Sequence, residues 1–155
     1  MAVVITQVRP DSPEAVGLIR ELEAHLEPLY APESRHGFSV ERLVAEGVDF
    51  FVLRTDGVPA GCGGVLFVDG EDAQYGEIKR MWVSPRFRGL GYGKEILRHF
   101  EGHARDRGYA LLRLETGIHQ HEAIGLYEGL GFYRIPPFGP YFVDPVSLCY
   151  EKRLD

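Results

Sequence analysis

The sequence lacks the features that mark several large classes of protein. It has only 2 cysteines among its 155 residues, too few for a disulfide scaffold or a cysteine-ligated zinc site. No run of apolar residues approaches the roughly 18 that a membrane-spanning helix needs. The opening residues 1–8 are apolar, but they are too few for the core of a signal peptide and include no basic residue. We therefore expect a cytoplasmic protein that does not act at a membrane.

An excess of positive charge is also missing. The chain has 17 basic and 23 acidic residues, which gives a net charge of −6. A general nucleic-acid binder needs a surface that neutralises phosphates, so this balance argues against nucleic acid as a partner. With 45% hydrophobic residues, the chain has enough apolar surface to form a core. Its length predicts one domain over residues 1–155.

Hydrophobic periodicity and turn residues predict an α+β protein with a mixed, mostly antiparallel central sheet flanked by helices. The turns Asp56-Gly57 and Asp69-Gly70 predict three successive antiparallel strands. The pattern then changes to strand, glycine-rich turn, helix and strand. The expected strands are 3–8, 50–54, 60–68, 75–83, 110–116 and 146–153. The expected helices begin at Pro13, near Val40, near Gly91 and at Glu122.

The most informative string is the glycine-rich turn that runs from Arg86 to Lys94, Arg-Phe-Arg-Gly-Leu-Gly-Tyr-Gly-Lys. Glycines let a ligand approach the backbone closely, and the N-terminus of the following helix supplies free N–H groups with a partial positive charge. Arg86, Arg88 and Lys94 add positive charge in an otherwise acidic chain. Together these features predict a phosphate-binding site.

Two common phosphate-binding motifs do not fit this turn. A P-loop would need a glycine where Arg88 stands and a hydroxyl residue where Glu95 stands. The dinucleotide fingerprint Gly-x-Gly-x-x-Gly, started at Gly91, would need a third glycine where Ile96 stands, and the turn follows strands that are predicted to be antiparallel. The sequence also offers no ligands for magnesium, so a nucleotide-dependent enzyme is disfavoured and no metal site is expected.

With its flanking segments, this turn resembles the signature of the GNAT family of N-acetyltransferases. The matching segments are the turn residues 88–93, Arg-Gly-Leu-Gly-Tyr-Gly; the preceding residues 77–83, Glu-Ile-Lys-Arg-Met-Trp-Val; residues 114–117, Leu-Glu-Thr-Gly; and residues 123–132, Ala-Ile-Gly-Leu-Tyr-Glu-Gly-Leu-Gly-Phe. The resemblance covers about residues 50–132. It implies acetyl-CoA as a co-substrate, and it implies that the strand ending at Val83 separates from the strand at 110–116 to admit the acetyl group.

In such enzymes the pyrophosphate lies on the amides of the turn, and the pantetheine arm follows the end of the preceding strand. Asparagine is common near the last helix of the family, and here Gln120 is the residue that could replace it. The residues implied to bind acetyl-CoA are Met81, Trp82, Val83, Arg88, Gly89, Leu90, Gly91, Tyr92, Gly93, Lys94 and Gln120.

The resemblance also implies direct attack of an amine on the thioester, without an acyl-enzyme. Tyr127 matches the family's general acid, although a packed helix aromatic is the alternative interpretation. Glu77 is the candidate base, with a water relay as an alternative. Strand alternation would place Glu77 and Lys79 on the same face as Met81 and Val83. Glu77 could equally be a solvent-facing charge, an ion-pair partner of its basic neighbours, or a group that binds a cationic substrate.

The sequence carries few signals for the site that would bind the acetyl acceptor. Candidate wall residues are Tyr30, Glu33, Arg35 and His36 in one loop and Tyr141 in another, although both loops could be plain connections. We expect an acetyltransferase that acts on a primary amine of a small molecule. A non-catalytic acyl-CoA-binding module and an acetyltransferase of protein lysines or N-termini are the alternatives. Exposed edge strands make a homodimer a further expectation.

Overall fold

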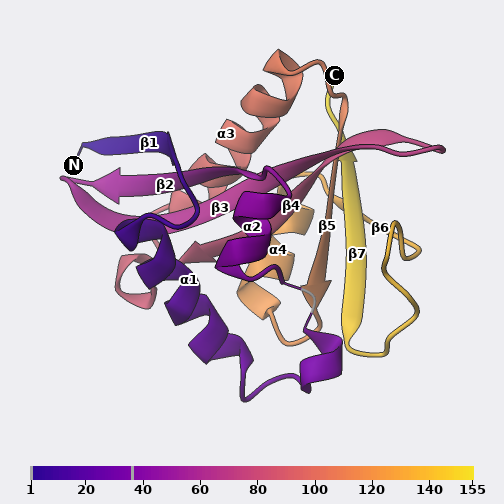
Figure 1. Ribbon diagram of the computed structural model, residues 1–155, viewed down its shortest axis with the longest axis horizontal. Coiled ribbons are helices and arrows are strands. Elements are labelled where there is room, and N and C mark those ends of the chain that lie inside the picture. The colour runs from indigo at the N-terminus through magenta and orange to yellow at the C-terminus, as the bar shows by residue number, and fades with distance from the viewer. Residues whose placement is uncertain (1, 36) are drawn as a thin grey trace.

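The computed structural model describes residues 2–35 and 37–155. Its described strands form one seven-stranded sheet with the order β1-β2-β3-β4-β5-β7-β6 (Figure 1). The strands are β1 (Val3–Val8), β2 (Asp49–Thr55), β3 (Val58–Asp69), β4 (Gln74–Val83), β5 (Leu111–Gly117), β6 (Tyr133–Ile135) and β7 (Ser147–Arg153). The helices are α1 (Pro13–Leu26), α2 (Val40–Ala45), α3 (Tyr92–Asp106) and α4 (His121–Gly129), with 3₁₀ turns at Pro32–Ser34 and Pro85–Phe87.

The α+β prediction is confirmed, because β4 and β5 form the one parallel pair described and the other neighbours are antiparallel. The predicted strands and helices are present, with ends that differ by a few residues. The short strand β6 was not predicted. None of the described helices is both long enough and apolar enough to cross a membrane.

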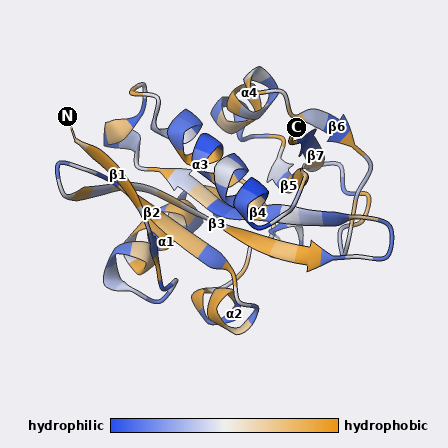
Figure 2. Ribbon diagram, turned by 90° about the horizontal axis from the view of Figure 1, so that it is seen from above, coloured by the Kyte–Doolittle hydropathy of each residue, from blue (hydrophilic) through white to orange (hydrophobic). Residues whose placement is uncertain are grey.

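Helices cover both faces of the sheet (Figures 1 and 2). On one face α1 buries Leu18, Ile19 and Leu22 in a core that α2 extends. On the other face α3 and α4 pack over a larger core, to which α3 contributes Ile96 and Phe100. Burying each such side chain contributes about 1.5–3 kcal/mol, so the two apolar helix faces hold the sheet between them.

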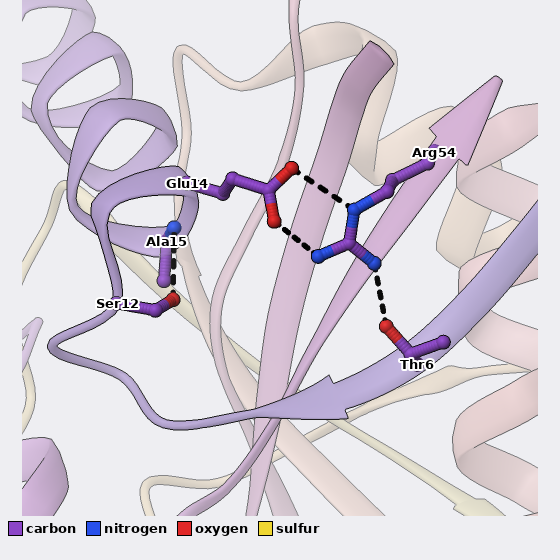
Figure 3. A network of polar contacts seen from close by, with 5 residues as sticks. All are labelled: Thr6, Ser12, Glu14, Ala15 and Arg54. Carbon is purple, nitrogen blue, oxygen red and sulfur yellow. Dashed lines mark hydrogen bonds and ion pairs between the residues drawn. The ribbon is translucent and has the colours of Figure 1, made fainter. Parts of the chain in front are cut away.

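Figure 3 shows how α1 is anchored to the neighbouring strands. The Ser12 hydroxyl accepts a hydrogen bond from the amide of Ala15 at 3.4 Å, which caps the helix just before Pro13. The carboxylate of Glu14 pairs with Nε of Arg54 on β2 at 2.9 Å and with Nη2 of the same side chain. Arg54 Nη1 donates to Thr6 on β1 at 2.6 Å. One guanidinium therefore ties the first helix to two strands.

We expect Glu14→Gln to lower the free energy of unfolding by about 0.5–1 kcal/mol, because the pair is partly exposed and solvent screens it. The Arg54 hydrogen bond holds the pKa of Glu14 below its usual value. A lowered pKa in the folded state means that the stabilisation is present above the unfolded pKa and is lost as pH falls through the folded pKa. Thermal unfolding of both proteins at pH 7 and pH 3 measures this. A difference of the same size at both pH values would contradict the prediction.

One prediction for β4 was wrong. Strict alternation would place Met81 and Val83 on the face of Glu77 and Lys79. Instead Met81 and Val83 pack into the core under α3, whereas the ammonium of Lys79 lies over an aromatic ring of the core under α1. The reason is a bulge at Arg80, whose φ of 54° accompanies a register shift between β3 and β4. An extra residue in a strand exchanges the faces of all the residues that follow it.

The parallel strands β4 and β5 stay together over a short distance. Their register contains two pairs, Gly76 with Leu112 and Glu77 with Arg113. Beyond these pairs the two strands separate toward their carboxyl ends, as the family resemblance implied. The separation leaves a gap in the middle of the sheet, and the candidate site lies in this gap.

Candidate functional site

The glycine-rich turn presents unpaired backbone N–H groups. The first residue of α3 whose amide bonds to the backbone behind it is Glu95, which donates to the Gly91 carbonyl at 3.1 Å. In residues 2–35 and 37–155, no described group accepts a hydrogen bond from the amides of residues 89–94. No side chain caps this helix. Such a row of free donors at the positive end of a helix dipole forms an anion-binding cradle.

The three glycines of the turn have two different roles. Gly89 and Gly91 have φ values of 80° and 82°, which side-chain-bearing residues rarely adopt, and a Cβ on either would project into open space. Gly93 is different, because a Cβ there would lie 2.7 Å from a methyl group of Leu126 on α4. The first two glycines therefore shape the cradle, and the third lets α4 pack against the start of α3.

A cleft of about 530 Å³ runs from this cradle along the end of β4 to the start of α4. The residues predicted to bind acetyl-CoA that line it are Met81, Trp82, Val83, Arg88, Gly89, Gly91, Tyr92, Gly93, Lys94 and Gln120. Leu90 is not among the lining residues and is half exposed. Arg88 holds the turn against β4, since its Nε donates to the Val83 carbonyl at 3.1 Å and its guanidinium lies 4.6 Å from the ring centre of Trp82.

A second cavity, of about 350 Å³, lies in the gap between β4 and β5. It shares Met81, Gln120 and Tyr127 with the cleft, so the two spaces meet. Tyr30 and Arg35, two of the predicted acceptor residues, line the cavity. Three other predicted acceptor residues are not placed on its wall: Glu33 is exposed on a 3₁₀ turn, Tyr141 lies behind the wall, and His36 falls outside the described residues.

Tyr127 lies where the cleft and the cavity meet. Its side chain is 6% exposed, and its hydroxyl is 3.9 Å from the sulfur of Met81. Burial raises the pKa of Tyr127, and the charge of Glu115 raises it further. The hydroxyl therefore keeps its proton at neutral pH. The ring also packs against Phe132, with 5.8 Å between the ring centres, so Tyr127 is a packed helix aromatic that also lines both spaces.

Glu77 does not reach either space. Its carboxylate is buried and forms an ion pair with Lys79 at 2.9 Å. It also accepts a hydrogen bond from the Tyr141 hydroxyl at 2.5 Å, and Lys79 Nζ donates to the same hydroxyl at 2.8 Å. Neither the cleft nor the cavity has Glu77 on its wall. This geometry matches the ion-pair alternative for Glu77, and it places Tyr141 as the hydrogen-bonding partner of that pair.

Three charged residues on the cavity wall were not singled out from the sequence: Glu23 on α1, Arg80 on β4 and Glu115 on β5. Glu115 accepts a hydrogen bond from the Ser147 hydroxyl at 2.6 Å. Its position in the segment 114–117, which carries part of the family resemblance, was the signal available for it. Arg80 also lies in a matching segment, 77–83, but strand alternation did not place it toward the cavity, because the bulge that orients it is not visible in the sequence. Among the described residues, no group of three potential metal ligands is assembled.

Tyr30 joins the two spaces. Its hydroxyl accepts a hydrogen bond from the amide of His119 at 2.9 Å and donates to Oε1 of Gln120 at 3.0 Å. Gly117 makes room for this contact, because a Cβ there would overlap the tyrosine hydroxyl. A predicted acceptor residue and a predicted co-substrate residue therefore bond directly to each other.

Comparison with known proteins finds one family that matches most of the chain. Residues 16–132 match the model of the acetyltransferase (GNAT) family. The chain is 41% identical to an IAA acetyltransferase of Azospirillum brasilense over 98% of both chains. It is 34% identical to the uncharacterised N-acetyltransferase YsnE of Bacillus subtilis over 91% of this chain and 93% of that protein.

Solved structures agree on the fold. The crystal structure of a putative acyl-CoA N-acyltransferase from Klebsiella pneumoniae superposes with a TM-score of 0.81 at 36% identity, and the match covers 99% of this chain and 98% of that one. The PaiA N-acetyltransferase of Thermoplasma acidophilum, solved with coenzyme A, has the same fold with a TM-score of 0.77 at 18% identity over 99% of both chains. With the cradle, the cleft and the split sheet, these matches show that the chain belongs to the GNAT family of acetyl-CoA-dependent N-acetyltransferases.

Proposed function

We propose that this enzyme transfers the acetyl group of acetyl-CoA to a primary amine of a small molecule by direct attack. The observation that carries the proposal is the meeting of two spaces at Met81 and Tyr127. One space ends in an anion cradle that suits a pyrophosphate, and the other is a cavity of about 350 Å³ that suits a small acceptor. The name of the Azospirillum relative, IAA acetyltransferase, supports a small acceptor.

Acetyl-CoA supplies an activated thioester. The free amides of residues 89–94 hold the pyrophosphate, with Arg88 and Lys94 adding charge. Backbone groups at the end of β4, from Met81 to Val83, line the cleft where the thioester oxygen gains negative charge, and amides there would stabilise it. As the amine nitrogen forms its bond to the acetyl carbon, the carbon–sulfur bond breaks and the Tyr127 hydroxyl protonates the leaving sulfur.

The amine must lose a proton before or during the attack, and two carboxylates are candidates for the base. Glu115 lines the cavity beside the gap, and its charge acts on the hydroxyl of Tyr127. Glu77 is buried behind the wall and paired with Lys79, so it could accept a proton only through a relay such as a water chain. We therefore propose Glu115 as the base and assign Glu77 the role of holding Lys79 and Tyr141 in place.

We expect Glu115→Gln to lower kcat about 100-fold, because a positioned general base contributes about two to four orders of magnitude. Glu77→Gln is the matched control, since it makes the same change of a carboxylate to an amide on the neighbouring strand. We expect this control to keep kcat within about threefold but to reduce stability, because Lys79 loses its buried counter-charge. Steady-state rates and thermal unfolding of both variants measure the two effects. The reverse ranking of the two kcat losses would return the base role to Glu77.

The first experiment separates the proposal from its alternatives. Calorimetric titration measures acetyl-CoA affinity, and thiol release then measures turnover with small amines and, in parallel, with lysine-containing and N-terminal peptides. Micromolar binding with turnover of small amines supports the proposal. Binding without turnover of any acceptor would favour a non-catalytic acyl-CoA-binding module, and turnover of peptides alone would favour a protein acetyltransferase.

We also propose a domain organisation, a cellular location and an oligomeric state for the enzyme. We propose one domain over residues 1–155, supported by the single continuous sheet. A cytoplasmic location is supported by the two buried, unpaired cysteines, Cys62 and Cys149. A homodimer is supported by the edge position of β1, where Val4 is half exposed. Size-exclusion chromatography with light scattering tests the dimer.

A further inference from the structure

The cavity of about 350 Å³ between β4 and β5, called the acceptor cavity below, carries both positive and negative charges on its wall. Its described wall contains two carboxylates, Glu23 and Glu115, and two guanidinium groups, Arg35 and Arg80. The other lining residues are largely apolar or uncharged, with Leu22, Leu26, Ile78 and Leu114 among them. These two negative and two positive charges sum to zero, but such a wall differs from an uncharged one. Each charge can pair with one end of a dipolar ligand.

Arg80 is the charge held most firmly. Its side chain is 10% exposed, and its Nε donates to the Phe38 carbonyl at 2.9 Å. Gly37 packs against the guanidinium so closely that a Cβ there would lie 2.6 Å from Cζ. The positive φ of Arg80 is an unfavourable conformation for a residue with a side chain. A strained backbone, a dedicated carbonyl and a glycine therefore fix one cation at the cavity wall.

The guanidinium of Arg80 retains capacity for an anion. Its Nη2 contacts Glu23 at 3.2 Å, but that carboxylate is 51% exposed, so the pair is weak and can be shared. No described residue accepts a hydrogen bond from its Nη1. Burial lowers the pKa of Arg80, and the Glu23 charge offsets this only in part. The buried cation is therefore incompletely compensated, and an anionic ligand would complete its pairing.

We propose that the acceptor is an amine that also carries a carboxylate, and that Arg80 recognises this carboxylate with Arg35 at the mouth of the cavity. The inference rests on the proposed function and names the substrate class of the same site. The amine end lies toward Glu115 and Tyr127, where the two spaces meet. The carboxylate end lies toward α1, where Arg80 contacts Glu23. Arg80 is a specificity-determining residue in this arrangement and takes no part in proton transfer.

The test uses matched acceptors with the full-length enzyme and acetyl-CoA. Thiol release is measured for a panel of α- and ω-amino acids, each beside its carboxyl-free counterparts; L-phenylalanine, L-phenylalaninamide and 2-phenylethylamine form one such set. We expect kcat/KM to be at least about tenfold higher for the best amino acid than for its counterparts, because a charge-assisted hydrogen bond is lost in the latter.

Arg80→Gln then assigns the preference to one residue. We expect it to raise KM for the carboxylate acceptor about thirtyfold with a smaller change in kcat, and to leave KM for the carboxyl-free amine within about twofold. Arg80→Lys should restore part of the loss, because the charge returns without the planar fork. A structural role alone, through the Phe38 carbonyl, would raise KM for both kinds of acceptor equally and would overturn the inference.

Glu23→Gln provides a second test if the Arg80 variants do not fold. The side chain of Glu23 is 51% exposed, so this change should not prevent folding. Removing this competing carboxylate should lower KM for the carboxylate acceptor about threefold, and KM for the carboxyl-free amine should not fall with it. An equal change for both acceptors would contradict the proposal.

The possible failures are distinguishable. If carboxyl-free amines are acetylated as well as or better than amino acids, the proposed function stands and this inference is overturned. If no amine of either kind accelerates thiol release while acetyl-CoA still binds, the proposed function fails and the inference fails with it.

Discussion

Replacing Tyr127 by phenylalanine is expected to lower kcat about 100-fold and to leave acetyl-CoA affinity within about twofold. The ring and its packing against Phe132 remain, so the variant removes one hydroxyl at the point where the cleft and the cavity meet. A general acid contributes about two to four orders of magnitude to the rate, and the raised pKa of Tyr127 keeps its proton available at neutral pH. Thiol release and calorimetric titration measure the two quantities.

Tyr150→Phe is the matched control. Tyr150 is also buried, and its hydroxyl donates to Glu128 at 2.7 Å, but it lines neither space. We expect the control to lose about 1 kcal/mol of stability, because it removes a structural hydrogen bond. Its kcat should equal that of the wild type. Equal turnover of Tyr127→Phe and the wild type would remove the acid role and leave Tyr127 as a packed aromatic.

Gly91→Val is expected to weaken acetyl-CoA binding on the order of 100-fold. Gly91 has a φ of 82°, and its missing side chain faces open space beside the free amides of the cradle. A β-branched side chain would occupy the space of the phosphate, and its backbone preference would move the donors that hold the anion. Each lost charge-assisted hydrogen bond costs about 1.5–3 kcal/mol, so one or two account for the expected loss.

Gly47→Val separates backbone strain from the loss of the cradle. Gly47 has a φ of 71° and equally open surroundings, but it follows α2 and lines neither space. We expect the two variants to lose similar stability and the Gly47 variant to bind acetyl-CoA as the wild type does. Unchanged affinity in a folded Gly91→Val protein would refute the anion-cradle interpretation.

Much of the co-substrate cleft could be predicted because nine of its predicted lining residues lie in one stretch of the sequence, 81–94. A strand end, a turn with glycines and a helix start carry local signals, and ten of the eleven predicted residues line the cleft. The exception, Leu90, shows that proximity within the turn does not determine which way a side chain points. Tyr127 could be singled out as the candidate acid for the same reason, because it lies in a continuous segment that carries the family resemblance, and it lines both spaces.

The acceptor cavity could not be predicted in the same way. Its wall is assembled from α1, the loop after it, β4, β5 and α4, so no single segment carries its pattern. The bulge at Arg80 was decisive, because one inserted residue turned Arg80 toward α1 and Met81 toward α3. Strand alternation assumes that no such insertion occurs, and nothing in the sequence marks this one, since Arg80 is not a glycine.

The hydrogen bond between Tyr30 and Gln120 connects the walls of the two spaces, and we expect it to link the binding of the two substrates thermodynamically. Gln120 borders both spaces, and Tyr30 on the acceptor wall depends on it for position. Ordering this contact for one ligand reduces the conformational entropy that remains to be lost when the second ligand binds. Such coupling is reciprocal: acetyl-CoA changes the affinity for the acceptor by the same factor by which the acceptor changes the affinity for acetyl-CoA. We therefore expect each substrate to bind more tightly when the other is already in place, with the tyrosine–glutamine pair as the link.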